Sequence, residues 1–183
     1  MNCIKLRVSD YKKYKLYGGN LITIVFFTQG FWAIFQYRIA HAFYKIQIPI
    51  LKQLLKILCL FWQKGIEIVT GISIPASVKI GHSFYIGHFG NIILNAKTII
   101  GNNCNVSQGV TVGVSGQGKN RGIPKIGNNV YIGANAVVVG NIVIGDNVLI
   151  AACSLVNTDV TCNSVMLGVP AIKKKRKSSE GYV

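Results

Sequence analysis

Aliphatic residues recur at every sixth position along much of the chain. The longest series is Ile126, Ile132, Val138, Ile144, Ile150 and Val156. An earlier series runs through Ile74, Ile80, Ile86 and Ile92 and, after a two-residue shift, through Ile100, Val106 and Val112. A period of six matches neither an α-helix nor a half-buried strand. It predicts a prism of short strands, three to a coil, in which each repeat places one aliphatic side chain inside.

The expected fold class is therefore mostly β: a parallel β-helix over residues 71–172, preceded by a small α-helical region over residues 1–70 and followed by a basic tail, 173–183. Glycine and asparagine supply the backbone angles that tight corners need. Residues 113–125, GVSGQGKNRGIPK, interrupt the repeat and predict an extruded loop. Such a loop either borders an anionic ligand or is a tolerated insertion.

The first 70 residues have helical spacing. One helix is expected over GFWAIFQYRIAHAFYK, residues 30–45, and a second begins at Pro49 and includes ILKQLLKILCLFWQK. The broad apolar face of the second helix either packs against the β-helix and neighbouring subunits or rests on a membrane, with its lysines among anionic head groups. Residues 16–37 carry no charge, but polar residues interrupt them, which argues against a membrane span.

The charge balance is strongly basic. Twenty Lys and Arg against five Asp and Glu give a net charge of +15, which predicts anionic partners. No basic stripe or aromatic platform indicates nucleic acid. The five cysteines lack zinc spacing, so we expect no metal and reduced thiols in a cytoplasmic protein, either free or peripheral on the cytoplasmic face of the inner membrane.

Three features occur in the same order as in a known family: the helix sequence YRIAHAFY, the six-residue repeat and the closing GVPA at 168–171. The chain resembles the serine acetyltransferase branch of the hexapeptide-repeat acyltransferases, especially shorter relatives thought to acetylate surface polysaccharides. The resemblance implies a left-handed coil, acetyl-CoA as co-substrate, and a homotrimer or a dimer of such trimers.

The resemblance also implies that His88, which follows Ile86 and Gly87, is the general base that takes the proton of an acceptor hydroxyl. Gly113 is the candidate oxyanion donor. The alternative makes His88 a water-exposed corner residue, which is the favoured interpretation of His82. His41 is expected to be a surface or helix-packing histidine. A cysteine nucleophile is disfavoured because no base is close in sequence.

The family's coenzyme A site implies six contacts, of which the first two are three hexapeptides apart and so stack on one face: Ala134, Ala152, Asn157, Thr158, Lys173 and Lys174. The residues expected to bind the acceptor are Tyr85, Asn91, Lys119 and Arg121.

Departures from the family's serine site shape the acceptor prediction. Gly87 stands where an aspartate is expected, and Gly122 and Ile123 stand where an arginine–histidine pair is expected; the nearest acids in sequence are Glu67 and Asp146. An ammonium group needs an anionic partner. We therefore expect a sugar hydroxyl of a surface polysaccharide, or a lipid-linked glycan precursor, as acceptor. Two alternatives remain: a serine O-acetyltransferase of cysteine biosynthesis and a non-catalytic β-helix scaffold.

Overall fold

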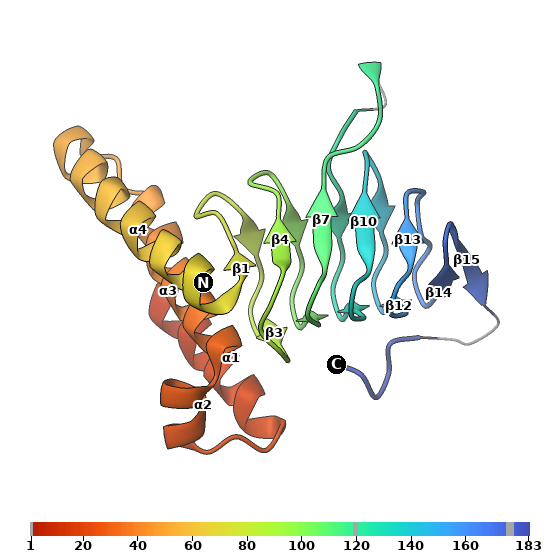
Figure 1. The fold of residues 1–183 in the computed structure, drawn as a ribbon, viewed down its shortest axis with the longest axis horizontal. Coiled ribbons are helices and arrows are strands. Elements are labelled where there is room, and N and C mark those ends of the chain that lie inside the picture. Colours follow the sequence, from red (N-terminus) through yellow and green to blue (C-terminus); the bar gives the residue numbers. More distant parts are fainter. Residues whose placement is uncertain (1, 119–120, 175–177) are drawn as a thin grey trace.

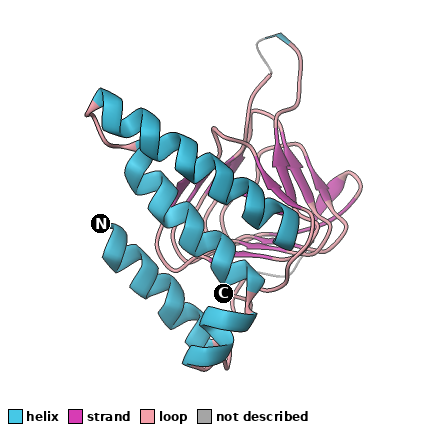
Figure 2. Cartoon of the chain, turned by 60° about the vertical axis from the view of Figure 1, so that its left-hand side comes forward, coloured by secondary structure: helices cyan, strands magenta, loops and turns pink. Residues whose placement is uncertain are grey.

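A layer of helices covers one end of a three-sided β-helix (Figures 1 and 2). The computed structural model describes residues 2–118, 121–174 and 178–183. The helices are α1 (Cys3–Leu16), α2 (Leu21–Phe27), α3 (Gln29–Tyr44) and α4 (Pro49–Thr70). Proline in the first turn of α4 and Gly71, left-handed at φ 66°, at its end fix the bounds of that helix.

The strands form the three faces of the β-helix. Sheet A contains β1 (Ile72–Ser73), β4 (Ile92–Leu94), β7 (Thr111–Gly113), β10 (Val137–Val139) and β13 (Leu155–Val156). Sheet B contains β2 (Lys79–Ile80), β5 (Ile99–Ile100), β8 (Lys125–Ile126) and β11 (Val143–Ile144). Sheet C contains β3 (Tyr85–Ile86), β6 (Asn105–Val106), β9 (Tyr131–Ile132), β12 (Leu149–Ile150), β14 (Val165–Gly168) and β15 (Ala171–Lys174).

Strands from successive coils pair in parallel, and in the described ranges only β14 and β15 pair antiparallel. The six-residue series forms the interior: Ile86, Ile132, Val138 and Ile150 are each 0% exposed. Glycine after the inward residue lets coils touch, since a Cβ on Gly101 would lie 2.5 Å from the Gly127 carbonyl oxygen. The predicted mostly β class and parallel β-helix are confirmed.

Asparagines with left-handed backbones form one edge of the prism, where the chain passes from sheet B to sheet C. The side chains of Asn103, Asn129, Asn147 and Asn163 donate one to the next, each at 2.9 Å. Lys13 of α1 completes this ladder by donating from Nζ to Asn103 Oδ1 at 2.7 Å. The asparagines therefore satisfy their own polar groups while they turn the chain.

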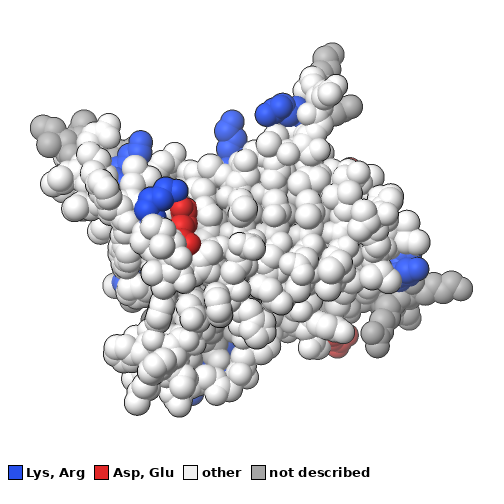
Figure 3. All heavy atoms as spheres, in the orientation of Figure 1, with Lys and Arg blue, Asp and Glu red and all other residues white. Residues whose placement is uncertain are grey.

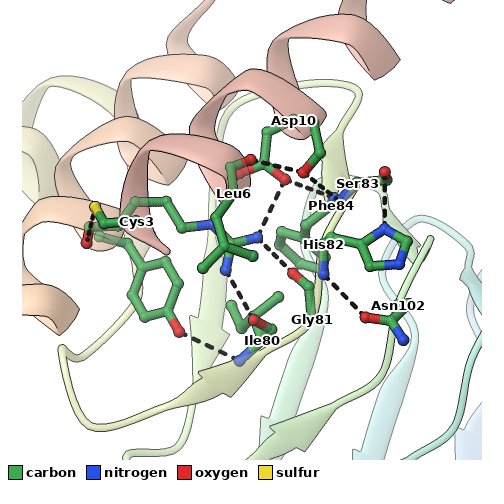
Figure 4. Close-up of polar contacts among 12 residues, drawn as sticks. Cys3, Leu6, Asp10, Ile80, Gly81, His82, Ser83, Phe84 and Asn102 are labelled. Atoms are coloured by element: carbon green, nitrogen blue, oxygen red, sulfur yellow. Dashed lines mark hydrogen bonds and ion pairs between the residues drawn. The ribbon is translucent and has the colours of Figure 1, made fainter. Parts of the chain in front are cut away.

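Helix side chains occupy the open edge of the first coil. Arg38 of α3 is fully buried; it donates to both carboxylate oxygens of Asp10, from Nε at 2.8 Å and from Nη2 at 3.1 Å, and to the Ile80 carbonyl at 2.8 Å. The carboxylate of Asp10 accepts the Phe84 amide at 2.8 Å (Figure 4). The hydroxyl of Tyr37 donates to the Val78 carbonyl at 2.7 Å. These contacts join the helical layer to the first coil and satisfy part of its open edge.

Two further segments leave the prism. The extruded loop is a narrow hairpin in which Ser115 and Gly122 exchange backbone hydrogen bonds of 3.2 and 3.0 Å (Figure 1). Residues 178–183 return across sheet C, where the Tyr182 carbonyl accepts from Asn105 Nδ2 at 2.6 Å. The basic run 173–177 is only partly described: Lys173 and Lys174 belong to β15, and residues 175–177 lie outside the described ranges.

We predict that Asp10→Ala lowers the free energy of unfolding by about 3–5 kcal/mol, because it leaves the Arg38 guanidinium buried without its anion. Urea unfolding at fixed protein concentration measures this change. Replacing both residues, Asp10→Ala with Arg38→Met, should cost less than the sum of the two single changes. A single-variant cost below about 1 kcal/mol would contradict the anchoring role.

Candidate active site

The edge of the prism between sheets C and A carries the sequence-predicted base. We call it the C–A edge; it consists of the corners at residues 87–91, 107–110, 133–136 and 151–154. The ladder register pairs Ile86 with Val106, Val106 with Ile132 and Ile132 with Ile150. Two residues beyond these strands, His88, Gln108, Ala134 and Ala152 therefore stack in one column. At about 4.8 Å per coil, the column descends about 14 Å from His88 to Ala152.

The His88 side chain is exposed on this edge, and among the described residues it has no hydrogen-bond partner. It lines a shallow cavity of about 290 Å³ together with Tyr85, Ser107 and Tyr131. An unpaired imidazole open to solvent can accept a proton from a bound hydroxyl. The same exposure fits a corner residue that faces water.

The predicted loop residues lie at the opposite edge of sheet A. The loop leaves β7 after Gly113 and enters β8 at Lys125, which is the passage from sheet A to sheet B, and Arg121 is exposed on it. Gly113 pairs with Val139 in the β7–β10 ladder, so its backbone takes part in the pairing of sheet A. Within one chain, the structure does not bring His88 together with Arg121 or Gly113. Lys119 lies outside the described residues.

The predicted coenzyme A contacts are also distributed over different edges of the prism. Ala134 and Ala152 are on the C–A edge, and Ala152 is exposed. Asn157 and Thr158, also exposed, follow β13 at the passage from sheet A to sheet B. Lys173 and Lys174 lie in β15 at the outer edge of sheet C, and Lys173 donates to Thr161 Oγ1 at 3.0 Å. The predicted contacts therefore lie on different edges of the prism.

The two remaining acceptor candidates have structural partners. Tyr85 is half-buried between rings of α1 and the turn after it, with centroids 4.6 Å from Tyr14 and 4.2 Å from Tyr17. Burial and the neighbouring Tyr17 raise the pKa of Tyr85. Asn91 occupies a corner with φ 51°, and its amide faces Gly71 at the end of α4. Tyr85 is therefore held by its ring contacts, whereas the Asn91 side chain is exposed.

The other titratable candidates are placed as packing groups. His41 Nδ1 lies 2.7 Å from the Ala76 carbonyl, and burial lowers the pKa of His41. His82 is exposed on the edge between sheets B and C, 3.1 Å from Ser83 Oγ (Figure 4). Burial raises the pKa of the Cys104 thiol to about 11, which keeps it protonated and unsuited to nucleophilic attack.

The end of α4 meets the C–A edge. The last turn of α4 stands where the corner preceding β1 would be, because the Gly90 amide donates to the Thr70 carbonyl at 2.9 Å and the Ile92 amide donates to the Gly71 carbonyl at 3.0 Å. Glu67 lies in that turn, and its carboxylate accepts from Ser73 Oγ of β1 at 2.7 Å. The acid is therefore held over sheet A at the end of the helical layer.

Comparisons with known proteins identify the family. Residues 123–158 match the bacterial transferase hexapeptide family (six repeats). A serine acetyltransferase of Synechococcus elongatus is 34% identical over 141 residues, 77% of this chain and 55% of that protein. One from Helicobacter pylori (strain J99) is 34% identical over 142 residues, 78% of this chain and 79% of that protein. The chain belongs to the serine acetyltransferase family.

Solved structures of serine acetyltransferases share the fold over most of this chain. A complex with cysteine has a TM-score of 0.82 at 30% identity and covers 94% of this chain and 70% of that one. The Neisseria gonorrhoeae enzyme in complex with serine has 0.79 at 32%, covering 94% and 69%. A complex with CoA has 0.79 at 29%, covering 94% and 69%. The fold is thus the left-handed parallel β-helix, as expected, and the predicted O-acetyltransferase class is that of the family.

The prediction of a sugar or lipid-linked glycan acceptor is wrong. Relatives from several species at 34–36% identity are named serine acetyltransferases, and one structural neighbour holds serine. The prediction rested on departures from the family's serine site and on the distance of the acids from His88 along the sequence, and neither shows where a carboxylate lies in the fold. The chain spans little more than half the length of the Synechococcus relative.

No helix in the described ranges is both long and apolar enough to cross a membrane. Nor do three or more His, Cys, Asp or Glu side chains gather there in a way that could hold a metal ion.

Proposed function

We propose that this protein is an acetyl-CoA-dependent serine O-acetyltransferase with His88 as general base. The observation that carries the proposal is the C–A edge, where an exposed imidazole without a described partner stands above a column that includes the small residues Ala134 and Ala152. The names of the relatives and the serine-bound and CoA-bound neighbours support this choice of substrates.

In the proposed reaction, the neutral His88 ring accepts the proton of the serine hydroxyl while the serine oxygen attacks the thioester carbonyl. The carbon–sulfur bond then breaks, and the imidazolium returns the proton to the departing thiolate. The products are O-acetylserine and free coenzyme A, and no acyl-enzyme forms. Any backbone amide that stabilises the oxyanion must lie outside the ladder bonds, which limits the predicted role of Gly113.

The division of candidate residues between two edges of sheet A supports a homotrimer. When three prisms pack around an axis, the C–A edge of one copy faces the opposite edge of sheet A of the next, which carries the loop with Arg121, Asn157 and Thr158. The groove between copies is where the proposed acetyl-CoA site lies. Small side chains such as Ala152 leave room for an extended ligand to lie along the coils.

His88→Ala should lower kcat by about 10²–10⁴-fold, because the hydroxyl then loses its base in the transition state. Thiol release from acetyl-CoA with L-serine measures the rate. His82→Ala is the matched control, since His82 is an exposed histidine on a different edge, and it should keep full activity. Equal rates for wild type and His88→Ala would assign His88 to the corner alone.

Ala152→Trp should raise the KM for acetyl-CoA at least tenfold by placing an indole in the groove, while the KM for serine changes little. The substitution is at an exposed position and should leave the fold intact. Ala152→Ser, which keeps the side chain small, is the control. Steady-state kinetics with each substrate varied in turn decide between these outcomes, and an unchanged acetyl-CoA KM would place the cofactor elsewhere.

We also propose that α2 rests on an anionic membrane surface. Leu21, Ile22, Phe26 and Phe27 are each more than 60% exposed, and the exposed Lys12 and Lys15 lie close to them along the chain. Residues 1–70 contain ten basic and two acidic side chains, a net charge of +8. This charge opposes a second copy on the same face and favours anionic lipid.

Replacing both Phe26 and Phe27 with serine should reduce binding to phosphatidylglycerol vesicles at least tenfold, because two apolar anchors are lost. Co-sedimentation with phosphatidylglycerol and with phosphatidylcholine vesicles measures the bound fraction. Leu167→Ser, an exposed position on β14, should bind like wild type. Wild-type protein that stays in solution with anionic vesicles would refute membrane contact.

A further inference from the structure

We infer that a cavity on the edge between sheets B and C binds a phosphate group. This cavity has a volume of about 510 Å³ and is bounded by α1, by the corners that carry Ser83 and Asn103, and by the returning segment 178–183. Lys12 and Lys13 line it from α1. Among the described residues, no Asp or Glu side chain lines it. The cavity therefore offers positive charge and hydrogen-bond donors without an anion to meet them.

Lys13 is a buried cation without an anionic partner. It is only 5% exposed, and its Nζ donates to Asn103 Oδ1 at 2.7 Å. That bond uses one of the three donors of the ammonium, and its acceptor is neutral. Neither of the two ion pairs in the described ranges includes Lys13, so no carboxylate there lies within 4 Å of its Nζ. A lysine buried in this way is normally paired, and a bound anion would supply the missing partner.

The ammonium of Lys13 keeps its charge at neutral pH. Burial lowers the pKa of Lys13 to about 8, although Cys104 and Asp10 act in the opposite direction. The carboxylate of Asp10 is already occupied by the Arg38 side chain and the Phe84 amide, at 2.8 Å each. An anion bound beside Lys13 Nζ would offset the cost of burying the charge.

Lys12 and Ser83 add to the donors that face the cavity. Lys12 is exposed and has no hydrogen bond or ion pair with another described residue, so its ammonium can turn toward a ligand. The Ser83 hydroxyl lies 3.1 Å from His82 Nδ1 on the corner next to α1 (Figure 4). A phosphate monoester carries a charge of about −1.5 to −2 at pH 7 and has three acceptor oxygens. Two ammonium groups match it better than they match a carboxylate, which brings one charge.

The walls of the cavity are fixed before a ligand binds. The Ser83 amide donates to Ser9 Oγ at 3.1 Å, which holds this corner against α1. Asn103 Nδ2 donates to Asn129 Oδ1 at 2.9 Å, so the asparagine ladder orients the oxygen that accepts from Lys13. A preformed site loses little conformational freedom on binding, which favours affinity.

The phosphate can come from two sources. The cavity volume lies within the range of about 300–1,000 Å³ that is usual for small-molecule sites, so a soluble phosphorylated compound fits. Tyr17 also lines the cavity, and α2 with its exposed apolar side chains begins shortly after it, so the phosphate of a lipid head group fits as well. The chemistry that the cavity recognises is the same in both cases.

The test is the binding of inorganic phosphate to the full chain, measured by isothermal titration calorimetry at low ionic strength. We expect Lys13→Met to lower the phosphate affinity about 10–100-fold, as for a lost hydrogen bond to a charged group. Lys12→Met removes an exposed charge and should lower the affinity about two- to fivefold. Lys15→Met is the matched control, because it removes the same charge from an exposed position on α1 that does not line the cavity, and it should bind like wild type.

Vesicles distinguish the two sources. Phosphatidic acid has a phosphate monoester as its head group, whereas phosphatidylglycerol has a phosphodiester. If Lys13→Met weakens co-sedimentation with phosphatidic acid vesicles and not with phosphatidylglycerol vesicles, the ligand is a lipid head group. If it weakens the binding of inorganic phosphate alone, the ligand is a soluble phosphate compound. Either result supports the site.

Two results would overturn the inference. One is a wild-type protein that neither binds inorganic phosphate nor prefers phosphatidic acid to phosphatidylglycerol. The other is equal binding of both probes by wild type and the two cavity variants. Thermal unfolding shows whether Lys13→Met folds, and if it does not, the comparison of Lys12→Met with Lys15→Met decides. None of these measurements uses acetyl transfer, so failure here leaves the proposed function standing.

Discussion

The open edge of the first β-helical coil is the constraint on which the rest of this structure depends. A parallel β-helix ends in unpaired amides and carbonyls, and a buried unpaired group costs about as much as a lost hydrogen bond. Here Arg38 and Asp10 satisfy part of that edge with a charged pair that is itself out of water. Burial of two ions is favourable only when each also finds further partners, and the carbonyl of Ile80 and the amide of Phe84 provide them.

This anchoring has a consequence for the candidate site. Because α1 and α3 are fixed to β2 and β3, the helical layer has one orientation, and α4, packed on α3, ends against the corner that carries His88. Glycine at two positions allows the close fit: a Cβ on Gly30 would lie 2.5 Å from the Ile86 carbonyl oxygen, and Gly71 contacts Gly90. The helices therefore complete the edge that the coils begin. Figure 3 shows few acidic atoms on the face it presents, in keeping with the excess of Lys and Arg over Asp and Glu.

The six-residue period was sufficient to predict the coils, because each hexapeptide has the same local requirement. It needs an inward aliphatic side chain followed by a small residue where the next coil approaches. Ile132 and Gly133 show both, with the first 0% exposed and the second without room for a Cβ. The packing of the helical region was harder to predict from the sequence. Helical spacing places Arg38, His41 and Lys45 on one stripe, yet Arg38 is buried. Asp10, the partner of Arg38, lies 28 residues away in the sequence, and a local pattern cannot predict a pair that far apart.

The same limit explains the error over the acceptor. Sequence distance is a poor measure of spatial distance in a solenoid, where the neighbour in space is one coil away and the neighbour in sequence is on another face. The acceptor prediction weighed the acids by their separation from His88 along the chain, which does not show where a carboxylate lies in the fold. The loop that carries Arg121 follows β7 of sheet A directly in the sequence. It nevertheless leaves sheet A from the edge opposite the one that carries His88. The proposed site uses both edges, so under this proposal catalysis depends on assembly of the copies as well as on folding.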